Sequence, residues 1–410
     1  MQSERSCGPN GDRRNDALPT ASKWIEIDVD AVVGNLQAVR SVISDKVRLI
    51  AVIKANAYGH GASEIAHLLA QQGVQYFAVT FLDEALQLRK SGLKSSIMLF
   101  SPVGSEAEAI EAVENNITMT VASRFDATFV DSACERLNRE ATVHLKTDTG
   151  LGQFGMEEDE IVPVWEMLQA NRRIFIEGIY THMAQGASNP SYTARQFKRF
   201  QHIIELLEQA GADIPVKHCA NSAVLLKYPH MHMNAVRTGT LLSGQIPAGV
   251  IHNLPLVDPY KFKSRIISLR RLKAGSRLGY YSTYRLRRDA QVAVIPVGFQ
   301  DGLALQVANK PAGLVDMLKH LVKMVLSYLN YGRFNLYVGI KGKNYPIRGK
   351  VFMQMALIEL PLETDVKIGD EVEVPVRKTL ASSDLTRVYV RDGQPVKIGR
   401  QESTTYFLDS

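Results

Sequence analysis

Short apolar runs alternate with stretches of helical period along the first 250 residues, and this rhythm limits the fold more than any other feature of the sequence. Such alternation is typical of repeated strand–helix units that build a parallel sheet. We expect eight of these runs to be strands: residues 48–54, 75–80, 96–100, 118–122, 142–148, 175–183, 216–221 and 235–239. Eight strands in succession predict an α/β fold in which the sheet closes into a TIM-like (β/α)8 barrel.

The rhythm changes near residue 250, where helical segments largely give way to β-branched and alternating runs such as AQVAVIPVGF, NLYVGIK and DEVEVPV. These runs predict a second, mostly β domain at the C-terminal end. We therefore expect a barrel over residues 23–250 and a β domain over residues 251–410. Residues 1–22 are rich in Gly, Asn, Asp and Arg, and we expect them to form a disordered tail.

One segment of the β domain has a helical pattern instead. Residues 313–329 read GLVDMLKHLVKMVLSYL, and their apolar side chains form one helical stripe with Asp316, Lys319 and Lys323 around it. We expect this helical insertion to pack onto its own domain. A helix that binds a membrane or a partner is the alternative.

Composition excludes several classes of function. The surplus of 48 basic over 42 acidic residues gives a net charge of +6, but the basic residues are scattered, so no nucleic-acid-binding stripe is predicted. Three cysteines without regular spacing argue against a disulfide framework and for a reducing compartment. The polar N-terminus does not resemble a signal peptide and no run is long enough to span a membrane, so we expect a cytoplasmic protein.

Polar side chains collect where the predicted barrel strands end. Chemistry in (β/α)8 barrels takes place at the C-terminal ends of the strands. The residues at these ends are Lys54, Asp148, His182, Asn221, Ser222 and Arg237. We expect Asp148 to shape its loop rather than to transfer protons. Read singly, His182 is also consistent with a buried barrel histidine and Arg237 with an ordinary cation. Their joint position favours a functional site.

The segment AVIKANAYGHG carries the clearest chemical signal. Lys54 follows the apolar residues of a predicted strand, and burial beside such a run disfavours the ammonium form. A neutral lysine amine condenses with an aldehyde. The following turn offers backbone N–H groups and the Tyr58 hydroxyl to an anion, which together suit pyridoxal phosphate. A solvated strand end is the alternative interpretation of the same lysine.

Other cofactors have little support in the sequence. His218, Cys219, His230 and His232 invite a metal hypothesis, but their spacing matches no zinc pattern, so we expect no metal site. No GxxxxGK[ST] or GxGxxG motif is present, which argues against nucleotide chemistry.

The chain resembles the fold III alanine racemases over residues 24–360. AVIKANAYGHG is similar to the family's cofactor-lysine motif, and LGYYSTY resembles the segment that carries its catalytic tyrosine. Six further segments follow in the family's order: KTDTGLGQFG, IYTHMA, ANSA, VRTG, PVGFQDG and GKVFMQ. The resemblance implies a barrel followed by a β domain, pyridoxal 5′-phosphate as cofactor, and a homodimer in which two subunits share each active site.

The resemblance also implies catalytic roles. Lys54 holds the cofactor and then acts as acid or base on one face of the substrate α-carbon, while Tyr280 serves the opposite face. Without the resemblance, Tyr280 reads as a packed strand aromatic. Arg237 faces the pyridine nitrogen, and its guanidinium keeps that nitrogen unprotonated. His182 links Arg237 to the tyrosine and favours its phenolate.

Binding roles follow from the same resemblance. The phosphate is met by the hydroxyls of Tyr58 and Ser222 and by the backbone N–H groups of Gly239 and Thr240. The substrate carboxylate meets the main chain of Met353 and the side chain of Gln153. Lys146 matches a lysine that is often carbamylated in the family.

Four positions depart from the family pattern. Gln153 stands where the family usually has an arginine, so one positive charge near the substrate carboxylate is lost. Gln354 replaces an aspartate and Phe299 a tyrosine. The C-terminal tyrosine–glutamate segment, which supplies a phosphate contact in the family, is absent. Tyr389 and Tyr406 are candidates to replace that contact, although neither lies in a matching sequence context.

The sequence therefore predicts an isomerase that interconverts L- and D-alanine by a two-base mechanism and supplies D-alanine for peptidoglycan. A racemase of serine, lysine or a broader range is one alternative, because Gln153 and the C-terminus differ from the family. A protein that holds the cofactor with weak or no turnover is another. Fold III decarboxylases are less favoured because they lack the counterpart of Tyr280.

Overall fold

The structure, a computed structural model, describes residues 21–305, 313–328, 336–382, 384–399 and 406–407 of the 410-residue chain. Its internal contacts divide it into two compact units. Val29–Pro259 form one, here called the barrel unit, and the segments Met1–Asp28 and Tyr260–Ser410 form the other, here called the β unit. Residues 1–20 of the predicted tail lie outside the described residues.

The barrel unit contains all eight predicted strands, in one parallel sheet of order β8-β7-β6-β5-β4-β3-β2-β9. The strands are β2 (Arg48–Val52), β3 (Tyr76–Val79), β4 (Ser96–Pro102), β5 (Thr118–Val121), β6 (Ala141–Lys146), β7 (Ile174–Tyr180), β8 (Val216–His218) and β9 (Ala235–Thr238). A parallel bridge between Ala220 and Val236 joins the two ends of this order, and Arg237 N donates to Ala220 O at 2.9 Å. The sheet therefore closes, and the predicted (β/α)8 barrel is confirmed.

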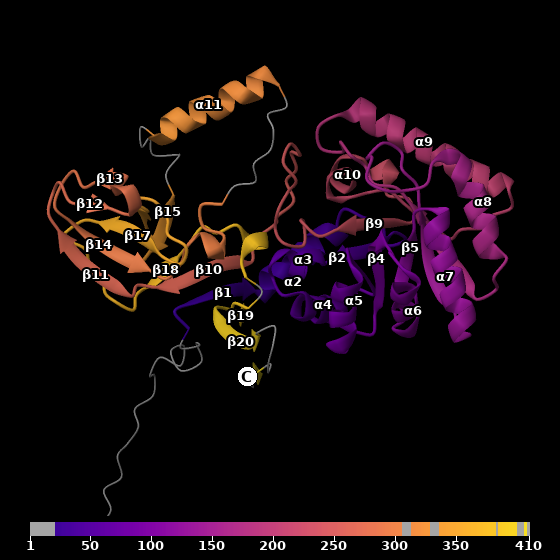
Figure 1. Cartoon of the computed structure of the whole chain (residues 1–410), viewed down its shortest axis with the longest axis horizontal. Coiled ribbons are helices and arrows are strands. Elements are labelled where there is room, and N and C mark those ends of the chain that lie inside the picture. The colour runs from indigo at the N-terminus through magenta and orange to yellow at the C-terminus, as the bar shows by residue number, and fades with distance from the viewer. Residues whose placement is uncertain (1–20, 306–312, 329–335, 383, 400–405, 408–410) are drawn as a thin grey trace, which may run out of the picture. The chain divides into compact units, whose positions relative to one another are not determined.

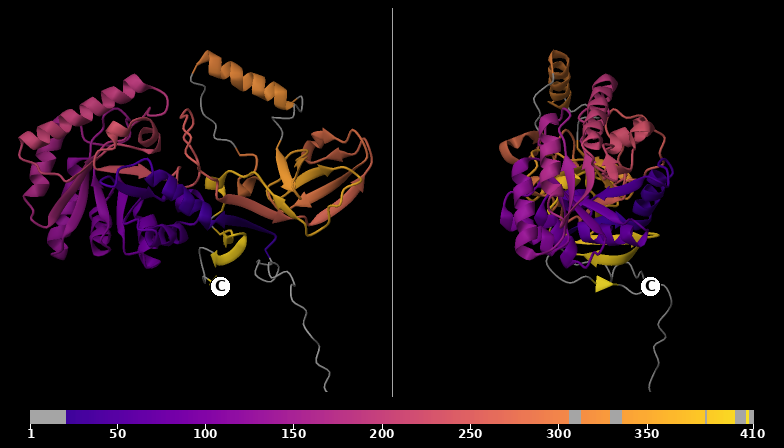
Figure 2. Two further views of the ribbon diagram at one scale, coloured as in Figure 1. Left: turned by 180° about the vertical axis from the view of Figure 1, so that it is seen from behind. Right: turned by 90° about the vertical axis from the view of Figure 1, so that its right-hand side faces the viewer.

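Helices connect the strands and lie around the outside of the barrel (Figures 1 and 2). They are α2 (Val29–Arg40), α4 (Ala62–Gln71), α5 (Leu82–Lys90), α6 (Glu106–Glu114), α7 (Arg124–Leu137), α8 (Glu158–Gln169), α9 (Pro190–Gln209) and α10 (Ser222–Lys227), with the single turn α3 (Lys54–Tyr58) and the 3-10 turn η1 (Pro229–Met231). Ser105, Ser123 and Asn189 cap helices α6, α7 and α9 through their side-chain oxygens.

The barrel interior explains why the strands read as nearly continuous apolar runs. Every residue of β3, β5 and β9 is buried, because a parallel strand is covered by helices on one face and by the barrel interior on the other. One interior cluster contains Ile50, Val52, Tyr76, Ala78, Met98, Tyr180, Val216 and Ala235. Polar groups share this interior, and their contacts position the candidate site.

The described residues of the β unit form three sheets, which confirms the mostly β character predicted for the C-terminal part. An eight-stranded sheet has the order β16-β15-β18-β10-β1-β19-β20-β21, and smaller sheets have the orders β11-β14-β17 and β12-β13. The strands are β1 (Lys23–Asp28), β10 (Tyr260–Arg265), β11 (Ser268–Leu272), β12 (Arg277–Leu278), β13 (Tyr284–Arg285), β14 (Ala290–Ile295), β15 (Tyr337–Ile340), β16 (Lys343–Pro346), β17 (Ala356–Leu360), β18 (Glu371–Glu373), β19 (Arg387–Arg391), β20 (Gln394–Gly399) and β21 (Tyr406–Phe407). Among the described residues, the 3-10 turns η2 (Tyr280–Ser282), η3 (Phe299–Asp301) and η5 (Lys378–Leu380) and the helix α11 (Leu314–Tyr328) lie between them.

The first strand differs from the expected division of the chain. The prediction assigned residues 23–28 to the barrel, whereas β1 pairs antiparallel with β10 and parallel with β19 in the β unit. Trp24 of β1 packs with Val388 and Val390 of β19 in a buried cluster. The strand pattern of residues 23–28 is local, but the choice of partners depends on segments more than 200 residues away. The predicted boundary at residue 250 stays a prediction.

Helix α11 confirms the helical pattern of the insertion, but its packing differs from our expectation. Eight of its apolar side chains are exposed, with exposed fractions between 44% and 80%: Leu314, Val315, Met317, Leu318, Leu321, Val322, Met324 and Val325. The expectation that this stripe packs onto its own domain is therefore wrong. Among the described residues no helix combines the length and the apolar character needed to cross a membrane.

Candidate active site

A cavity of about 470 Å³ lies at the C-terminal ends of the barrel strands, where the polar residues were predicted to meet. Its lining includes Lys54, Tyr58, Lys146, Gln153, His182, Asn221, Ser222, Arg237, Gly239 and Thr240. These residues come from the ends of β2, β6, β7, β8 and β9. Barrel closure therefore brings together most of the predicted site residues, while Tyr280 and Met353 belong to the β unit.

Lys54 opens an unusual turn. Strand β2 ends at Val52, and the backbone from Ala55 to Tyr58 then adopts left-handed φ angles of 49° to 56° at four successive non-glycine residues. Each such residue costs on the order of 1–2 kcal/mol relative to a right-handed conformation. Strain of this kind persists where the surroundings hold it, and it gathers at functional sites. Lys54 is half-buried at the start of this turn.

Glu84 of α5 holds the turn from outside. Its Oε1 accepts from Ala55 N at 2.6 Å, and its Oε2 accepts from Thr80 N at 2.9 Å and Phe81 N at 3.1 Å. Asn56 adds a second constraint, because its Oδ1 accepts from Ala62 N at 2.7 Å. The carboxylate thereby ties the end of β3 to the lysine turn. Glu84 carries no motif of its own, so the sequence did not predict this role.

An anion cradle lies beside the lysine turn. A Cβ added at Gly239 would overlap the Tyr58 ring and lie 2.6 Å from its hydroxyl oxygen, so only glycine fits there. Burial raises the pKa of Tyr58 to about 12, and the hydroxyl is therefore a proton donor near neutral pH. The Thr240 hydroxyl is buried without a hydrogen-bond partner in the described part of the chain. Ser222 Oγ lies 2.9 Å from Thr238 Oγ1.

These observations test whether pyridoxal phosphate suits the site. An unpartnered buried hydroxyl at Thr240, a protonated phenol at Tyr58 and an obligatory glycine at 239 match the donors and the space that a phosphate needs. Lys54 supplies the amine that an aldehyde requires. The residues present therefore fit the cofactor.

Arg237 is fully buried and hydrogen-bonded on both terminal nitrogens. Nη1 donates to His218 Nδ1 at 2.6 Å and to His218 O at 3.2 Å, and Nη2 donates to Thr181 O at 2.8 Å. Its guanidinium also lies over the Tyr180 ring, 5.2 Å from the centroid. Burial lowers the pKa of Arg237, but guanidinium remains the charged form at neutral pH.

His182 lines the same cavity. Burial first, and then the cations Arg237, Lys146 and Lys54, lower the pKa of His182 to about 3, so the imidazole is neutral. Asn221 Nδ2 lies 3.5 Å from its Nε2. The hydrogen bonds of Arg237 in this structure go to residues other than His182.

Lys146 and Asp148 occupy the loop after β6. Burial, followed by the charge of Arg237, lowers the pKa of Lys146 to about 8, and its Nζ lies 3.4 Å from the centroid of the Phe154 ring. Asp148 Oδ1 accepts from the backbone N–H groups of Gly150 at 2.8 Å and Leu151 at 2.7 Å. The interpretation of Asp148 as a residue that shapes its loop is confirmed.

The predicted site residues of the β unit lie in open surroundings. Tyr280 is 63% exposed at the turn η2 and contacts Phe352 edge-on, with ring centroids 5.0 Å apart. Met353 is 58% exposed. Phe299 is also exposed, and Gln354 donates to Gln300 at 3.1 Å.

The two tyrosines considered for the missing C-terminal contact have different outcomes. Tyr389 is buried in β19 within the β unit. The side chain of Tyr406 lies outside the described side chains. The metal hypothesis gains no support: within the described ranges no group of three His, Cys, Asp or Glu side chains is placed to hold a metal ion. His232, for example, contacts Leu225 O through Nε2 at 2.8 Å.

Comparisons with known proteins agree with this geometry. Residues 27–247 match the family model "Alanine racemase, N-terminal domain", and residues 260–388 match "Alanine racemase, C-terminal domain". An alanine racemase of Methanococcus maripaludis is 31% identical over 355 residues, covering 86% of this chain and 88% of the relative. Alanine racemase 1 of Oceanobacillus iheyensis is 32% identical over 356 residues, with 86% and 88% covered.

Solved structures show the same similarity. An alanine racemase from Clostridium difficile 630 superposes with a TM-score of 0.83 at 27% identity, covering 94% of this chain and 100% of that one. The alanine racemase from Bacillus anthracis with bound L-Ala-P gives 0.79 at 25% identity, with 94% and 99% covered. With both family models matched in order and the predicted barrel residues gathered in one cavity, the chain belongs to the alanine racemase family of isomerases.

Proposed function

We propose that this family member interconverts L- and D-alanine with pyridoxal 5′-phosphate bound in the barrel cavity. The observation that carries the proposal is the convergence of Lys54, the Tyr58–Gly239–Thr240 cradle and Arg237 on one cavity. When bound, the cofactor acts as an electron sink that makes the α-proton of an amino acid acidic. Membership of the family, whose relatives in Methanococcus maripaludis and Oceanobacillus iheyensis are named alanine racemases, supports alanine as substrate.

In this proposal the barrel residues bind and orient the cofactor. The hydroxyls of Tyr58, Ser222 and Thr240 and the backbone N–H groups of Gly239 and Thr240 hold the phosphate. Arg237 presents its guanidinium to the pyridine nitrogen, where a second positive charge is costly, and so keeps a proton off that atom. Lys54 holds the cofactor through its Nζ.

Two groups then move protons. Lys54 Nζ takes or returns the α-proton on one face of the substrate, and the Tyr280 hydroxyl serves the other face. Racemisation needs this arrangement, because a proton leaves one face and another arrives on the opposite face. Since Tyr280 is exposed on the β unit, we propose that it completes the site of a second subunit in a homodimer.

Gln153 bears on the choice of substrate. It lines the cavity and offers a neutral amide, which donates a hydrogen bond to a carboxylate without adding charge. The alternative of a broader amino-acid range rests on this residue. A panel of L-amino acids that includes alanine, serine and lysine separates the two.

Lys146 is a further part of the proposal. Its lowered pKa of about 8 increases the neutral fraction that attacks carbon dioxide, forming an N–C bond with release of one proton. The resulting carbamate is an anion beside Gln153. Carbon-13 NMR of protein kept in labelled bicarbonate detects it.

The proposed activity is tested with purified protein loaded with the cofactor. We expect L-alanine to lose optical rotation and to exchange its α-proton with deuterated water. Lys54→Ala is expected to abolish both signals and the borohydride-reducible bond to the cofactor, whereas Lys94→Ala, an exposed control, keeps them. Loaded protein that shows neither exchange nor racemisation of L-alanine would contradict the proposal. A cytoplasmic role in supplying D-alanine for peptidoglycan is proposed with it.

A further inference from the structure

A chain of hydrogen bonds crosses the barrel interior from the cofactor cavity to a second pocket. Arg237 Nη1 lies 2.6 Å from His218 Nδ1, His218 Nε2 lies 2.9 Å from His144 Nδ1, and His144 Nε2 lies 3.1 Å from Glu177 Oε2. Arg237, His218 and His144 are fully buried or nearly so. This hydrogen-bond chain therefore joins four neighbouring strands, β9, β8, β6 and β7, through side chains alone.

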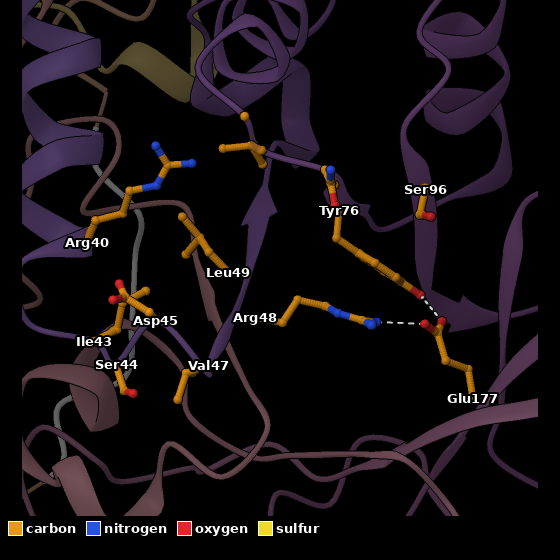
Figure 3. Close-up of a pocket in the computed structure, with 13 residues that line it drawn as sticks. Arg40, Ile43, Ser44, Asp45, Val47, Arg48, Leu49, Tyr76, Ser96 and Glu177 are labelled. Carbon is orange, nitrogen blue, oxygen red and sulfur yellow. Dashed lines mark hydrogen bonds and ion pairs between the residues drawn. The ribbon is translucent and has the colours of Figure 1, made fainter.

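The far end of the chain opens to a pocket of about 440 Å³ at the end of the barrel where the strands begin. Figure 3 shows Arg48 and Tyr76 directed toward the Glu177 carboxylate in this pocket. Arg48 Nη1 donates to Oε1 at 2.6 Å, and the Tyr76 hydroxyl donates to Oε2 at 2.6 Å. Glu177 is thus held from the solvent side as well as from the interior.

The partners determine where each proton lies along the chain. A guanidinium only donates, so His218 Nδ1 accepts and the proton of neutral His218 is on Nε2. That N–H donates to His144, whose Nδ1 must accept and whose own proton is therefore on Nε2. This second N–H points to a carboxylate oxygen, which accepts. One direction of donation runs from Arg237 to Glu177 without a conflict.

The charges agree with this assignment. Burial, and then the charge of Arg237, lowers the pKa of His218 well below its ordinary value, while burial lowers the pKa of His144, so both imidazoles are neutral. Burial alone raises the pKa of Glu177, but hydrogen bonds from His144 and Tyr76 outweigh it and bring the pKa to about 2. The hydrogen-bond chain therefore has the Arg237 guanidinium at one end and, at the other, the Glu177 carboxylate, which Arg48 also binds from the solvent side.

Arg237 needs such an anion because a buried charge is costly without a compensating one. Among the described residues, the hydrogen bonds of its guanidinium lead to carbonyl oxygens and to His218, and none leads directly to a carboxylate. Glu177 is the acid that its hydrogen-bond chain reaches. Hydrogen bonds in series polarise one another in a medium of low dielectric constant. The Glu177 charge therefore polarises His144 and His218 and increases the negative partial charge on the His218 nitrogen that faces Arg237.

We propose that Glu177 is a positioning residue for Arg237: it is the remote counter-ion of the guanidinium and sets the single tautomer of both intervening histidines. The consequence at the cofactor rests on the proposed function, in which Arg237 faces the pyridine nitrogen. The tautomers themselves do not depend on it. Glu177 acts through His144 and His218 and does not touch the reacting atoms.

The β unit of the protein offers a matched control for Glu177. Glu359 is also bound by an arginine and a tyrosine, since Arg348 Nε donates to its Oε2 at 2.8 Å and the Tyr284 hydroxyl donates at 2.9 Å. Its side chain is 11% exposed, compared with 16% for Glu177. Glu359→Gln therefore removes a similar carboxylate without a histidine chain behind it.

The first test is NMR of purified protein labelled with nitrogen-15 in its histidines, with His144→Gln and His218→Gln used to assign signals. We expect both wild-type rings to carry their proton on Nε2 and none on Nδ1. Glu177→Leu, which removes the acceptor, is expected to give His144 a mixed or reversed tautomer, whereas Glu359→Leu leaves the spectrum unchanged. A protonated Nδ1 in either wild-type ring would overturn the proposal, even if the protein proves to be no racemase.

The second test is the racemisation rate of Glu177→Gln, in which an amide keeps an acceptor but removes the charge. We expect kcat to fall about tenfold or more, with Glu359→Gln within about twofold of the wild type. Equal rates for the two variants would show that the remote charge is not used. If the wild type has no racemase activity, the proposed function fails while the NMR result still decides the tautomers.

Discussion

The barrel unit and the β unit hold their predicted site residues in opposite ways. Arg237 is buried among named hydrogen-bond partners, and the Lys54 turn is held by Glu84. Tyr280 and Met353 are exposed, and the described contact of the Tyr280 ring is with Phe352 of the same unit. The barrel therefore holds its predicted site residues in fixed positions, whereas those of the β unit lie on a surface.

This difference indicates how the proposed reaction is divided. Cofactor binding needs groups with fixed positions, and a closed barrel supplies them because every strand end has neighbours on both sides. A second proton donor on the opposite face of the substrate needs access from another direction, which an exposed tyrosine offers.

Mixed dimers test whether the exposed tyrosine serves another subunit. We expect Tyr280→Phe to lower racemisation about 10²- to 10⁴-fold, as loss of a general acid or base does, with little change in stability because the ring is exposed. Lys54→Ala is expected to be inactive as well. Dimers that combine one chain of each variant contain one site with both groups intact, and we expect them to regain activity. The measurement is the rate of differently tagged, co-purified mixed dimers.

Mixed dimers that form yet stay as inactive as their parents would remove the shared site from the proposal. Tyr281→Phe is the matched control, since Tyr281 is the neighbouring exposed tyrosine and has no proposed role. It is expected to keep the wild-type rate.

The buried histidines of the barrel predict a loss of stability in mild acid. His144, His182 and His218 all have pKa values lowered by burial, so they stay neutral in the folded state while the unfolded chain takes up protons below about pH 6.5. The unfolded state then binds more protons, so stability falls as the pH falls, by up to about 1.4 kcal/mol per pH unit for His182, whose pKa is lowered to about 3. Urea unfolding between pH 7.5 and 5.5 measures this slope.

His182→Gln supplies the control for the pH dependence. The amide does not titrate, so the variant is expected to lose about 1.4 kcal/mol per pH unit from the slope. From residue 260 onward the chain has one histidine, His320, which is exposed on α11. His320→Gln is the control outside the barrel unit, and the same change of slope in both variants would contradict the assignment to the barrel.

Glu84→Ala tests the clamp on the lysine turn. Removal of the carboxylate leaves the N–H groups of Ala55, Thr80 and Phe81 without this acceptor, at a cost of about 1–3 kcal/mol in stability. We also expect weaker cofactor binding, because the left-handed turn loses its outer support. Unfolding and cofactor titration measure the two effects. Glu111→Ala, an exposed change on α6, is the control, and a similar result for both variants would show that the clamp has no special role.

The smallest effect is expected on helix α11. Leu318→Gln replaces a side chain that is already exposed, so the free energy of unfolding should change by no more than about 0.5 kcal/mol. Leu278 lies on a strand of the same unit and is buried, so it is the contrasting position. Leu278→Ala is therefore expected to cost about 2–5 kcal/mol. A comparable loss from Leu318→Gln would indicate that α11 is covered in solution.

Much of the barrel was predictable because its signals are local. Apolar runs of strand length recur between helical segments, and burial on both faces makes each run nearly continuous. The chemistry-bearing residues were identified for the same reason, since Lys54, His182, Ser222 and Arg237 each follow or end such a run. The roles of these residues remain predictions, as does the role of Tyr280.

Other features have no local signal. The pairing of β1 with β10 and β19 joins residues that are far apart in the chain, and the exposed stripe of α11 resembles the stripe of a packed helix in sequence. A pattern shows which face of an element is apolar, but it does not name the surface that covers this face. Both departures from our expectations have this cause.

Local patterns predicted the order of the barrel elements, the mostly β character of the later part and the residues at the strand ends, because periodicity and turn chemistry act over a few neighbouring residues. The contacts of Glu84 with the Lys54 turn, and of Arg237 with Glu177 through His218 and His144, appeared only in the folded chain. Hydrogen-bond partners in a closed barrel come from separate strands, and their distances and proton positions are set when the last strand joins the first.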